Sequence, residues 1–228
     1  MPRTSDSLDA AGHRERLRSR LLEAGPEALN DQDLLEIVLF ALPRRDTKPI
    51  AKRLLDHFKT FSAVIAAPVA ELDRIEGLGT TGIAALKTVQ AGAVRLARAE
   101  VMNRAVLDKW DRLMEYLHAE LAHEKTEQFR VLFLDARNHL LADEEQSRGT
   151  VNHTPVYPRE VARRALELAA SAVILVHNHP SGDPTPSRED VAMTTEIATA
   201  LSTLSVVLHD HVIMGKGRWT SLRREGLF

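Results

Sequence analysis

The sequence predicts an α+β protein with an all-α N-terminal part and a C-terminal mixed sheet flanked by helices. Apolar residues recur with helical spacing from His13 to about Arg104, and no run in this part is typical of a strand. Beyond it, short apolar runs of strand length alternate with helical segments, which indicates a mixed sheet with helices packed against it. We therefore expect a flexible N-terminus at residues 1–12, a helical domain at 13–104 and a second domain at 105–228.

Start and stop signals divide the N-terminal part into helices. Gly25-Pro26 ends the first helix, Asn30 with Asp33 three residues later caps the second, and Pro49 fits the first turn of the third. A long alanine-rich helix follows Gly77-Leu78-Gly79. The predicted helices cover residues 14–24, 31–42, 47–58, 61–66, 69–74 and 79–100.

Unbroken apolar runs mark the strands of the C-terminal part. The run at 171–177 (SAVILVH) is typical of a strand in a sheet that is covered on both faces. A loop rich in proline and glycine, residues 178–186, follows it. The predicted strands are 129–134, a strand from His139, 171–177, 206–214 and 219–222, and the predicted helices are 109–123, 158–170 and 187–204.

The amino-acid composition excludes several classes of protein and several kinds of metal site. The chain has 228 residues, 44% hydrophobic and 27% charged, and no apolar run near the ~20 residues that span a bilayer. A polar start and the absence of a signal sequence favour a cytoplasmic protein with no membrane partner. With no cysteine, disulfides and thiolate ligands are excluded, so any metal must be held by His, Asp, Glu or backbone oxygen. The net charge of −2, with +2 on residues 1–105 and −4 on 106–228, does not indicate a strongly basic nucleic-acid binder.

His177, His179 and Asp190 form a predicted metal site. Residues i and i+2 at the end of a strand project to the same side, so both imidazoles can face one ion. Ser187 stands at the N-cap of the next helix, which places Asp190 in its first turn as a third ligand. Three protein ligands that leave one position for water are typical of a catalytic zinc site.

Each part of this pattern also has a plainer interpretation. Two histidines on a strand are often ordinary polar residues, and Ser187 with Asp190 is also a helix capping box. The combination of strand, His-x-His, stiff turn and acidic first turn serves no evident folding purpose, so we favour the metal site. A second His-x-His, His209 and His211 around Asp210, shares one face of a strand but lacks a third ligand, and we interpret Asp210 and His211 as supporting residues or residues at the edge of the core.

The segment from His177 to Asp190 resembles the JAMM motif of MPN-type zinc metallopeptidases, in which His-x-His is followed after seven positions by Ser-x-x-Asp. Every motif position is filled. Longer stretches resemble the bacterial RadC family, and the likeness extends over nearly the whole chain after the first dozen residues. These stretches are residues 129–132 (FRVL), 149–151 (GTV), 158–160 (PRE), 177–182 (HNHPSG) and 210–213 (DHVI), together with the N-terminal helical region.

The resemblance implies a fold and a set of roles. The fold would be a JAMM/MPN domain, similar to cytidine deaminases, behind a helix-hairpin-helix-like bundle. His177, His179 and Asp190 would bind Zn²⁺, Glu127 would act as general base on a water molecule, and Ser187 would stabilise the oxyanion. Glu124 is the alternative base, and Glu127 is favoured because it directly precedes the apolar strand. The implied reaction is cleavage of an amide or isopeptide bond in a peptide substrate.

The Gly77-Leu78-Gly79 turn resembles a helix-hairpin-helix. Such a turn exposes backbone N–H groups that bind a DNA phosphate without reading its sequence, and Thr80, Thr81 and Lys87 could assist. Equally, the two glycines could simply make a tight connection between helices, and Ile83 stands where the motif usually has a small residue. The alternative function is therefore a DNA-associated repair protein with a structural or vestigial zinc site. Deamination is disfavoured because zinc nucleobase deaminases use cysteine ligands.

Overall fold

The computed structural model of the chain describes residues 5–42, 46–102, 105–106, 110–121, 124–148 and 156–228. The 149–151 segment of the RadC resemblance, Pro43 and both ends of the helix predicted at 109–123 lie outside them. The chain forms two compact units, Met1–Gly92 and Ala93–Phe228. Their division falls inside a helix, twelve residues before the expected boundary at 104/105, because the second half of this helix packs into the core of the C-terminal unit.

Helices make up the described part of the N-terminal unit. Its first helix starts at Ser5, ahead of the expected start at Arg14, in a stretch without proline. Asn30 caps the second helix as predicted, and its side-chain oxygen accepts from Asp33 N at 2.9 Å. The elements are α1 (Ser5–Ala24), α2 (Asp31–Val38), α3 (Lys48–Phe58), α4 (Phe61–Ala66), α5 (Val69–Leu72) and α6 (Gly79–Met102), with 3₁₀ turns at Pro26–Ala28 and Leu39–Ala41.

A single apolar cluster forms the core of this unit. Its members come from α2 to α6, which explains how such short helices are stable: each buries one apolar face against the others. The fully buried members are Leu35, Leu39, Ala51, Leu54, Val64, Leu72, Leu78 and Leu86.

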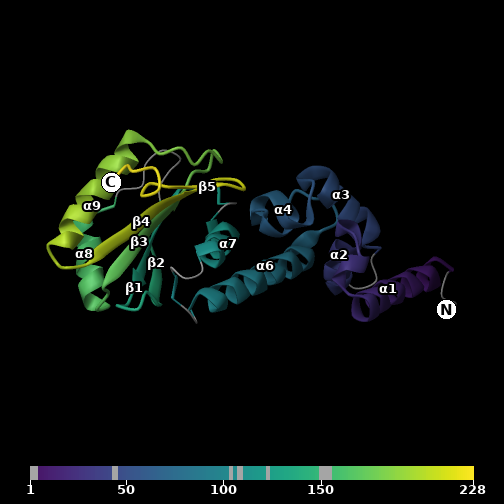
Figure 1. Cartoon of the computed structure of the whole chain (residues 1–228). Helices are drawn as coiled ribbons and strands as arrows, with labels where there is room; N and C mark the ends of the chain where they lie inside the picture. The colour runs from purple at the N-terminus through teal and green to yellow at the C-terminus, as the bar shows by residue number, and fades with distance from the viewer. Residues whose placement is uncertain (1–4, 43–45, 103–104, 107–109, 122–123, 149–155) are drawn as a thin grey trace. The chain divides into compact units, whose positions relative to one another are not determined.

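A five-stranded mixed sheet organises the C-terminal unit. The strands lie in the order β2-β1-β3-β4-β5, with β3 and β4 parallel and the other neighbours antiparallel (Figure 1). They are β1 (Gln128–Leu134), β2 (Leu140–Arg148), β3 (Ala172–Asn178), β4 (Val207–Met214) and β5 (Trp219–Ser221). The predicted mixed sheet flanked by helices is confirmed.

Helices cover both faces of the sheet. Helix α7 (Trp110–Leu121) packs on one face, and α8 (Pro158–Glu167) and α9 (Arg188–Ser202) pack on the other (Figure 1). Every residue of β3 is buried, as the unbroken apolar run predicts. Since β3 and β4 are parallel, α9 carries the chain back across the sheet between them, and its first turn lies near the end of β3.

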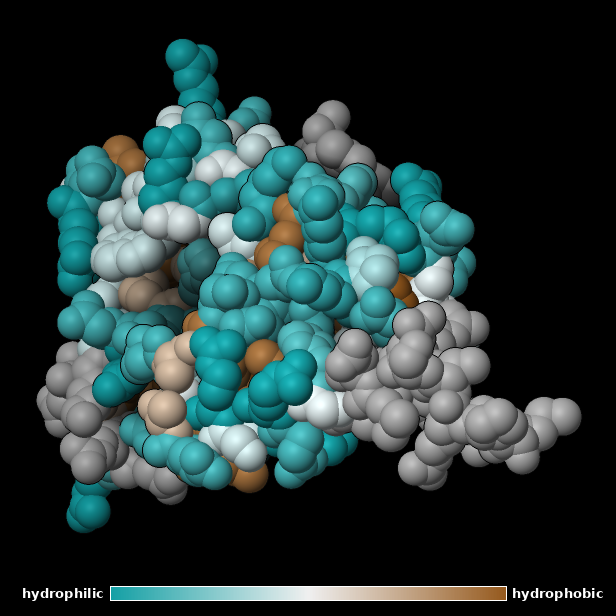
Figure 2. Space-filling view, turned by 90° about the vertical axis from the view of Figure 1, so that its right-hand side faces the viewer, coloured by the Kyte–Doolittle hydropathy of each residue, from teal (hydrophilic) through white to brown (hydrophobic). Residues whose placement is uncertain are grey.

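Among the described residues, no helix is long and apolar enough to cross a membrane. The face of the molecule that Figure 2 shows is mostly hydrophilic, with its hydrophobic residues scattered rather than gathered in a patch.

A buried ionic cluster joins α7 to the sheet. The fully buried side chain of Asp143 on β2 accepts from Arg130 Nε on β1 at 2.9 Å and from the Tyr116 hydroxyl of α7. Burial and the neighbouring Asp143 carboxylate raise the pKa of Tyr116, so its hydroxyl keeps the proton that it donates. Arg130 also lies 3.6 Å from Glu120.

We expect Asp143→Ala to lower the free energy of unfolding by about 3–5 kcal/mol, because the Arg130 guanidinium would stay buried without its main counter-charge. Urea denaturation measures this change. The matched control is Glu115→Ala, which breaks the exposed pair with Arg112 and should change stability little. Equal effects of the two substitutions would contradict the structural role of the cluster.

Candidate metal centre

Three side chains converge where β3 ends and α9 begins. His177 Nε2 lies 3.0 Å from His179 Nε2 and 3.3 Å from Asp190 Oδ1, and His179 Nε2 lies 3.7 Å from Asp190 Oδ2. Ligand atoms of a tetrahedral zinc ion, each about 2.0–2.1 Å from the metal, are separated by about 3.4 Å. The measured separations, which involve both oxygens of the Asp190 carboxylate, are close to this spacing. The structure brings together the three side chains that the sequence predicts as metal ligands, and their arrangement could hold a metal ion.

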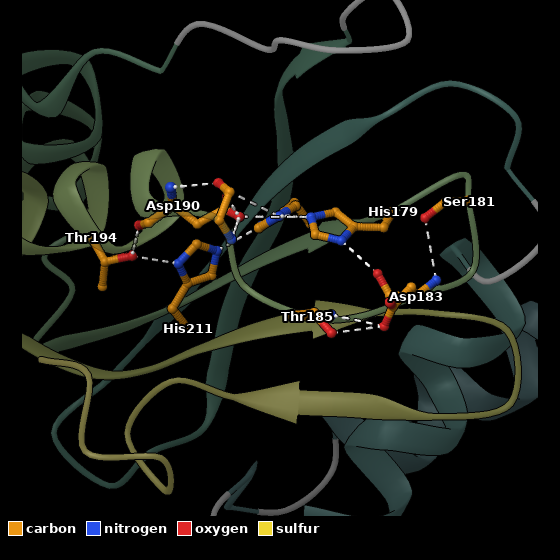
Figure 3. Close-up of polar contacts among 9 residues, drawn as sticks. His179, Ser181, Asp183, Thr185, Asp190, Thr194 and His211 are labelled. Carbon is orange, nitrogen blue, oxygen red and sulfur yellow. Dashed lines mark hydrogen bonds and ion pairs between the residues drawn. The ribbon is translucent and has the colours of Figure 1, made fainter.

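His177 is held on its far side by a second histidine. Its Nδ1 lies 2.8 Å from Nε2 of His211 on β4, and His211 Nδ1 lies 2.6 Å from Thr194 Oγ1 on α9. Phe129 packs against both rings, with centroids 6.1 Å from His177 and 5.6 Å from His211. Packing and hydrogen bonds together fix the plane of the His177 ring. Figure 3 shows the contact between Thr194 and His211.

His179 is oriented by the loop that follows it. Its Nδ1 donates to the backbone oxygen of Asp183 at 2.7 Å, which leaves Nε2 to face the other ligands. The Asp183 carboxylate in turn accepts from the hydroxyl of Thr185 at 2.8 Å (Figure 3). A backbone carbonyl is a frequent partner for the second nitrogen of a metal-binding histidine.

Asp190 is held by the helix cap. The Ser187 hydroxyl and backbone N–H both donate to Asp190 Oδ2 at 2.7 Å, and Asp190 N donates to Ser187 Oγ at 3.1 Å. This is the predicted capping box, and it is compatible with the ligand role because Oδ1 still faces His177. Ser187 and Asp190 can therefore form the helix cap and contribute to the predicted metal site at the same time.

The environment moves the pKa values of the two histidines in opposite directions. Burial lowers the pKa of His177 to about 4, so this ring is neutral. The hydrogen bond with Asp190 raises the pKa of His179. Burial alone would raise the pKa of Asp190, but His179, His177 and the Ser187 bonds outweigh it and hold that pKa far below its usual range. The site thus holds a carboxylate beside one neutral and one readily protonated imidazole.

Glu127 lies beside this group, directly before β1. Its charge contributes to the raised pKa of His179, so its carboxylate is within electrostatic range of the ligands. Glu124, the alternative base, contacts the end of β3 through its backbone oxygen, which accepts from Asn178 Nδ2 at 3.4 Å. The same amide donates to Thr126 O at 3.1 Å, and its oxygen accepts from Gln128 N at 2.9 Å. The Asn178 side chain therefore holds the turn that carries Glu127.

Gly215 lets the proline-rich loop approach the sheet. A Cβ at this position would lie 2.5 Å from Gly182 O and 2.9 Å from Pro184 Cδ, closer than real Cβ contacts come. The backbone bonds His179 N to Met214 O at 2.9 Å and Lys216 N to Gly182 O at 3.2 Å close the loop onto the end of β4. This contact sets the position of the segment that carries His179.

The two rings of the second His-x-His, His209 and His211, do not lie on the same face of β4. Pairing of β3 with β4 shifts register between Leu208 and Asp210, so His209 is the extra residue of a β-bulge. His209 Nε2 contacts Asn138 Oδ1 at 2.7 Å, whereas His211 faces His177. Asp210 is buried and accepts from Ser221 Oγ at 2.5 Å. The supporting role expected for His211 and Asp210 agrees with these contacts, but the shared face expected for the two rings is wrong, because the bulge reverses the alternation.

The sequence did not single out Asn178, Thr194 or Gly215. Asn178 stands between the two histidines, and Thr194 lies one helical turn after Asp190, so proximity to the motif was the only signal available. Their roles depend on partners distant in sequence: the turn before β1 for Asn178, His211 for Thr194 and the 182–184 loop for Gly215.

The predicted phosphate-binding turn lies in the N-terminal unit. Gly77 and Gly79 have φ of 85° and 59°, and Gly79 opens α6. Lys87 points elsewhere, since its ammonium donates to Ile65 O at 3.3 Å and to Gln90 Oε1 at 2.7 Å. Arg53 reaches the turn instead, where its Nε donates to Glu76 O at 3.2 Å.

Comparison with known proteins gives two family matches and close relatives. Residues 107–227 match the RadC-like JAB domain family, and residues 9–84 match the UPF0758 N-terminal family. A UPF0758 protein of Rhodobacter capsulatus is 59% identical over 212 residues, which are 92% of this chain and 99% of the relative. A UPF0758 protein of Ruegeria pomeroyi is 56% identical over 215 residues, 94% of this chain and 96% of the relative.

The opposed pKa shifts predict how pH changes the affinity for Zn²⁺. Below the ordinary histidine pKa of 6.5, the raised pKa of His179 means that the metal-free site holds one proton there, while His177, with a pKa of about 4, holds none. Zinc must displace that single proton, so affinity should fall by about tenfold per unit as the pH decreases from 6 to 5. Chelator-competition titrations measure the dissociation constant. A change of about a hundredfold per pH unit would show that two protons are displaced, so that His177 is protonated as well. This would contradict the assignment of a neutral His177 ring.

Proposed function

Because the chain belongs to the family of proteins with a RadC-like JAB domain, we propose that it is a zinc-dependent hydrolase of the JAMM type that cleaves amide or isopeptide bonds. The observation that carries the proposal is the convergence of His177 Nε2, His179 Nε2 and the Asp190 carboxylate. The two nitrogens lie 3.0 Å apart, His177 Nε2 lies 3.3 Å from Asp190 Oδ1, and His179 Nε2 lies 3.7 Å from Asp190 Oδ2. Two imidazoles and one carboxylate are a donor set typical of catalytic zinc.

The donor set fits zinc better than it fits Mg²⁺ or Ca²⁺. Those ions prefer six or more oxygen ligands, whereas two of the three atoms here are imidazole nitrogens. With three protein ligands, one tetrahedral position stays open for a water molecule or a substrate oxygen. Zinc would act there as a Lewis acid and lower the pKa of that water to about 7.

Glu127 is the proposed proton acceptor. A carboxylate beside the ligands can take the proton of the attacking water and deliver it to the leaving amine, which is general base and general acid catalysis by one group. Asn178 supports this role because it holds both ends of the turn, at Thr126 O and at Gln128 N. The position of Glu127 is thereby coupled to the end of β3, which carries His177 and directly precedes His179.

Ser187 is the proposed donor to the oxyanion. In the structure its hydroxyl donates to Asp190 Oδ2 at 2.7 Å. The backbone N–H of Ser187 makes a second bond to the same oxygen, so Asp190 stays held when the hydroxyl rotates toward a substrate oxygen. A hydroxyl that contacts the oxygen only as negative charge develops contributes to the transition state rather than to ground-state binding.

We expect Glu127→Gln to keep one zinc per chain and to lower kcat by about 10²- to 10⁴-fold, because the amide cannot accept a proton. Hydrolysis of mixed libraries of α-linked peptides and ε-lysine isopeptides, read by mass spectrometry, measures the rate, and elemental mass spectrometry measures the metal. The matched control is Glu124→Gln, which should stay active.

Loss of zinc in a His177→Ala/His179→Ala variant that remains folded supports the ligand assignment. Full activity of Glu127→Gln would exclude Glu127 as the base. Wild-type protein that takes up no zinc when the ion is supplied would contradict the proposed function.

DNA binding by the N-terminal unit is a second candidate. It is favoured by Gly79, whose positive φ opens the 24-residue helix α6 with no acidic residue in its first turn. Arg53 at the same turn adds one positive charge. Contact with phosphates would give a dissociation constant that rises with salt, and Gly79→Asp should weaken it. Fluorescence anisotropy with duplex DNA tests this, and binding that is absent or independent of salt contradicts it.

A further inference from the structure

Behind the metal centre, a chain of buried hydrogen bonds runs from α9 through β4 to β3. It starts at the backbone oxygen of Asp190, passes through Thr194 and His211, and ends at His177. Figure 3 shows the part from Asp190 to His211. Thr194 and His211 are both 0% exposed and His177 is 1% exposed, so their polar atoms rely on one another for partners.

The direction of each bond follows from the single proton of the Thr194 hydroxyl. Thr194 Oγ1 lies 2.5 Å from Asp190 O, a carbonyl that can only accept. The hydroxyl proton must point at this oxygen, because two oxygens at that distance repel each other without a proton between them. Thr194 Oγ1 can then only accept from His211 Nδ1, 2.6 Å away, so His211 carries its proton on Nδ1.

The same reasoning continues to the metal ligand. A buried imidazole with no carboxylate against it is neutral, because burying an uncompensated charge is costly. With its proton on Nδ1, His211 can only accept at Nε2, so His177 must donate from Nδ1 across the 2.8 Å contact. His177 Nε2 then carries a lone pair directed at His179 and Asp190.

We propose that Thr194, acting through His211, selects the Nδ1-protonated tautomer of His177 and so keeps the Nε2 lone pair directed at the metal position. Thr194 and His211 are positioning residues in this scheme, since neither contacts the ion. The proposal rests on the metal site of the proposed function, but the tautomer itself can be observed without metal or substrate.

The arrangement also links two ligands through one helical turn. Asp190 supplies a ligand through its side chain and anchors the Thr194 hydroxyl through its backbone oxygen. Thr194 follows Asp190 by four residues on α9, which is the spacing at which a threonine hydroxyl reaches a preceding carbonyl. Movement of the first turn of α9 would therefore disturb Asp190 and the orientation of His177 together.

The test compares wild type with Thr194→Val, which replaces the hydroxyl by a methyl group of similar size, and Thr194→Ser, which restores the hydroxyl. Thr195→Val is the matched control, because Thr195 bonds the carbonyl of Val191 in the same way but is exposed, whereas Thr194 is buried against His211. Two measurements are made: the dissociation constant for Zn²⁺ by chelator competition, and the ¹⁵N chemical shifts of the histidine rings in metal-free protein.

In wild type we expect the His177 shifts of a protonated Nδ1 and an unprotonated Nε2. Thr194→Val should reduce the population of this tautomer and weaken zinc binding by about 10- to 100-fold, as loss of a supporting partner does at other metal sites. Thr194→Ser and Thr195→Val should both resemble wild type.

A proton on Nε2 of His177 in wild type overturns the proposal, as does unchanged affinity and tautomer in Thr194→Val. Failure of Thr194→Ser to restore affinity would show that shape rather than hydrogen bonding matters, and would also overturn it. If wild type takes up no zinc, the proposed function fails, whereas the ring shifts of the metal-free protein still decide on the tautomer.

Discussion

The parallel pairing of β3 with β4 requires the chain to cross back over the sheet, and helix α9 is that crossover. The end of β3 carries His177, and the crossover helix begins beside this end, so Asp190 in its first turn lies next to His177. The partner strand then places His211 beside His177. The convergence of the predicted ligands and the placement of His211 behind them therefore both depend on the pairing of β3 with β4 and on the loop between β3 and α9.

The same edge of the sheet gathers the remaining groups. β1 runs antiparallel to β3, so its first residues lie beside the last residues of β3, and Phe129 pairs with His177. Glu127 therefore lies within electrostatic range of His179, although it precedes His177 by fifty residues. The Asn178 amide stabilises this arrangement of β1 and β3, because it forms hydrogen bonds with the backbone on both sides of Glu127.

Two neighbouring imidazoles acquire different properties from their surroundings. His177 is enclosed by Phe129 and His211, which favours the neutral ring, whereas His179 lies in the loop beside Asp190, which favours the protonated ring. Under the proposed function, such a site would exchange a single proton for a metal ion. The two histidines look equivalent in the His-x-His pattern, but their pKa values depend on different parts of the chain.

The local pattern of the sequence by itself determined the order of helices and strands, the cap at Asn30 and the three residues predicted as ligands. Periodicity, capping and the spacing from His177 to Asp190 are short-range properties. Tertiary structure decided what depends on strand register and close approach. The bulge at His209 turns it away from His211, Gly215 admits the loop that holds His179, and Thr194 meets His211 only when α9 lies on β4. The physical reason is that a one-residue shift in pairing reverses which face a side chain occupies, and such a shift arises from the packing of the whole sheet rather than from neighbours in sequence.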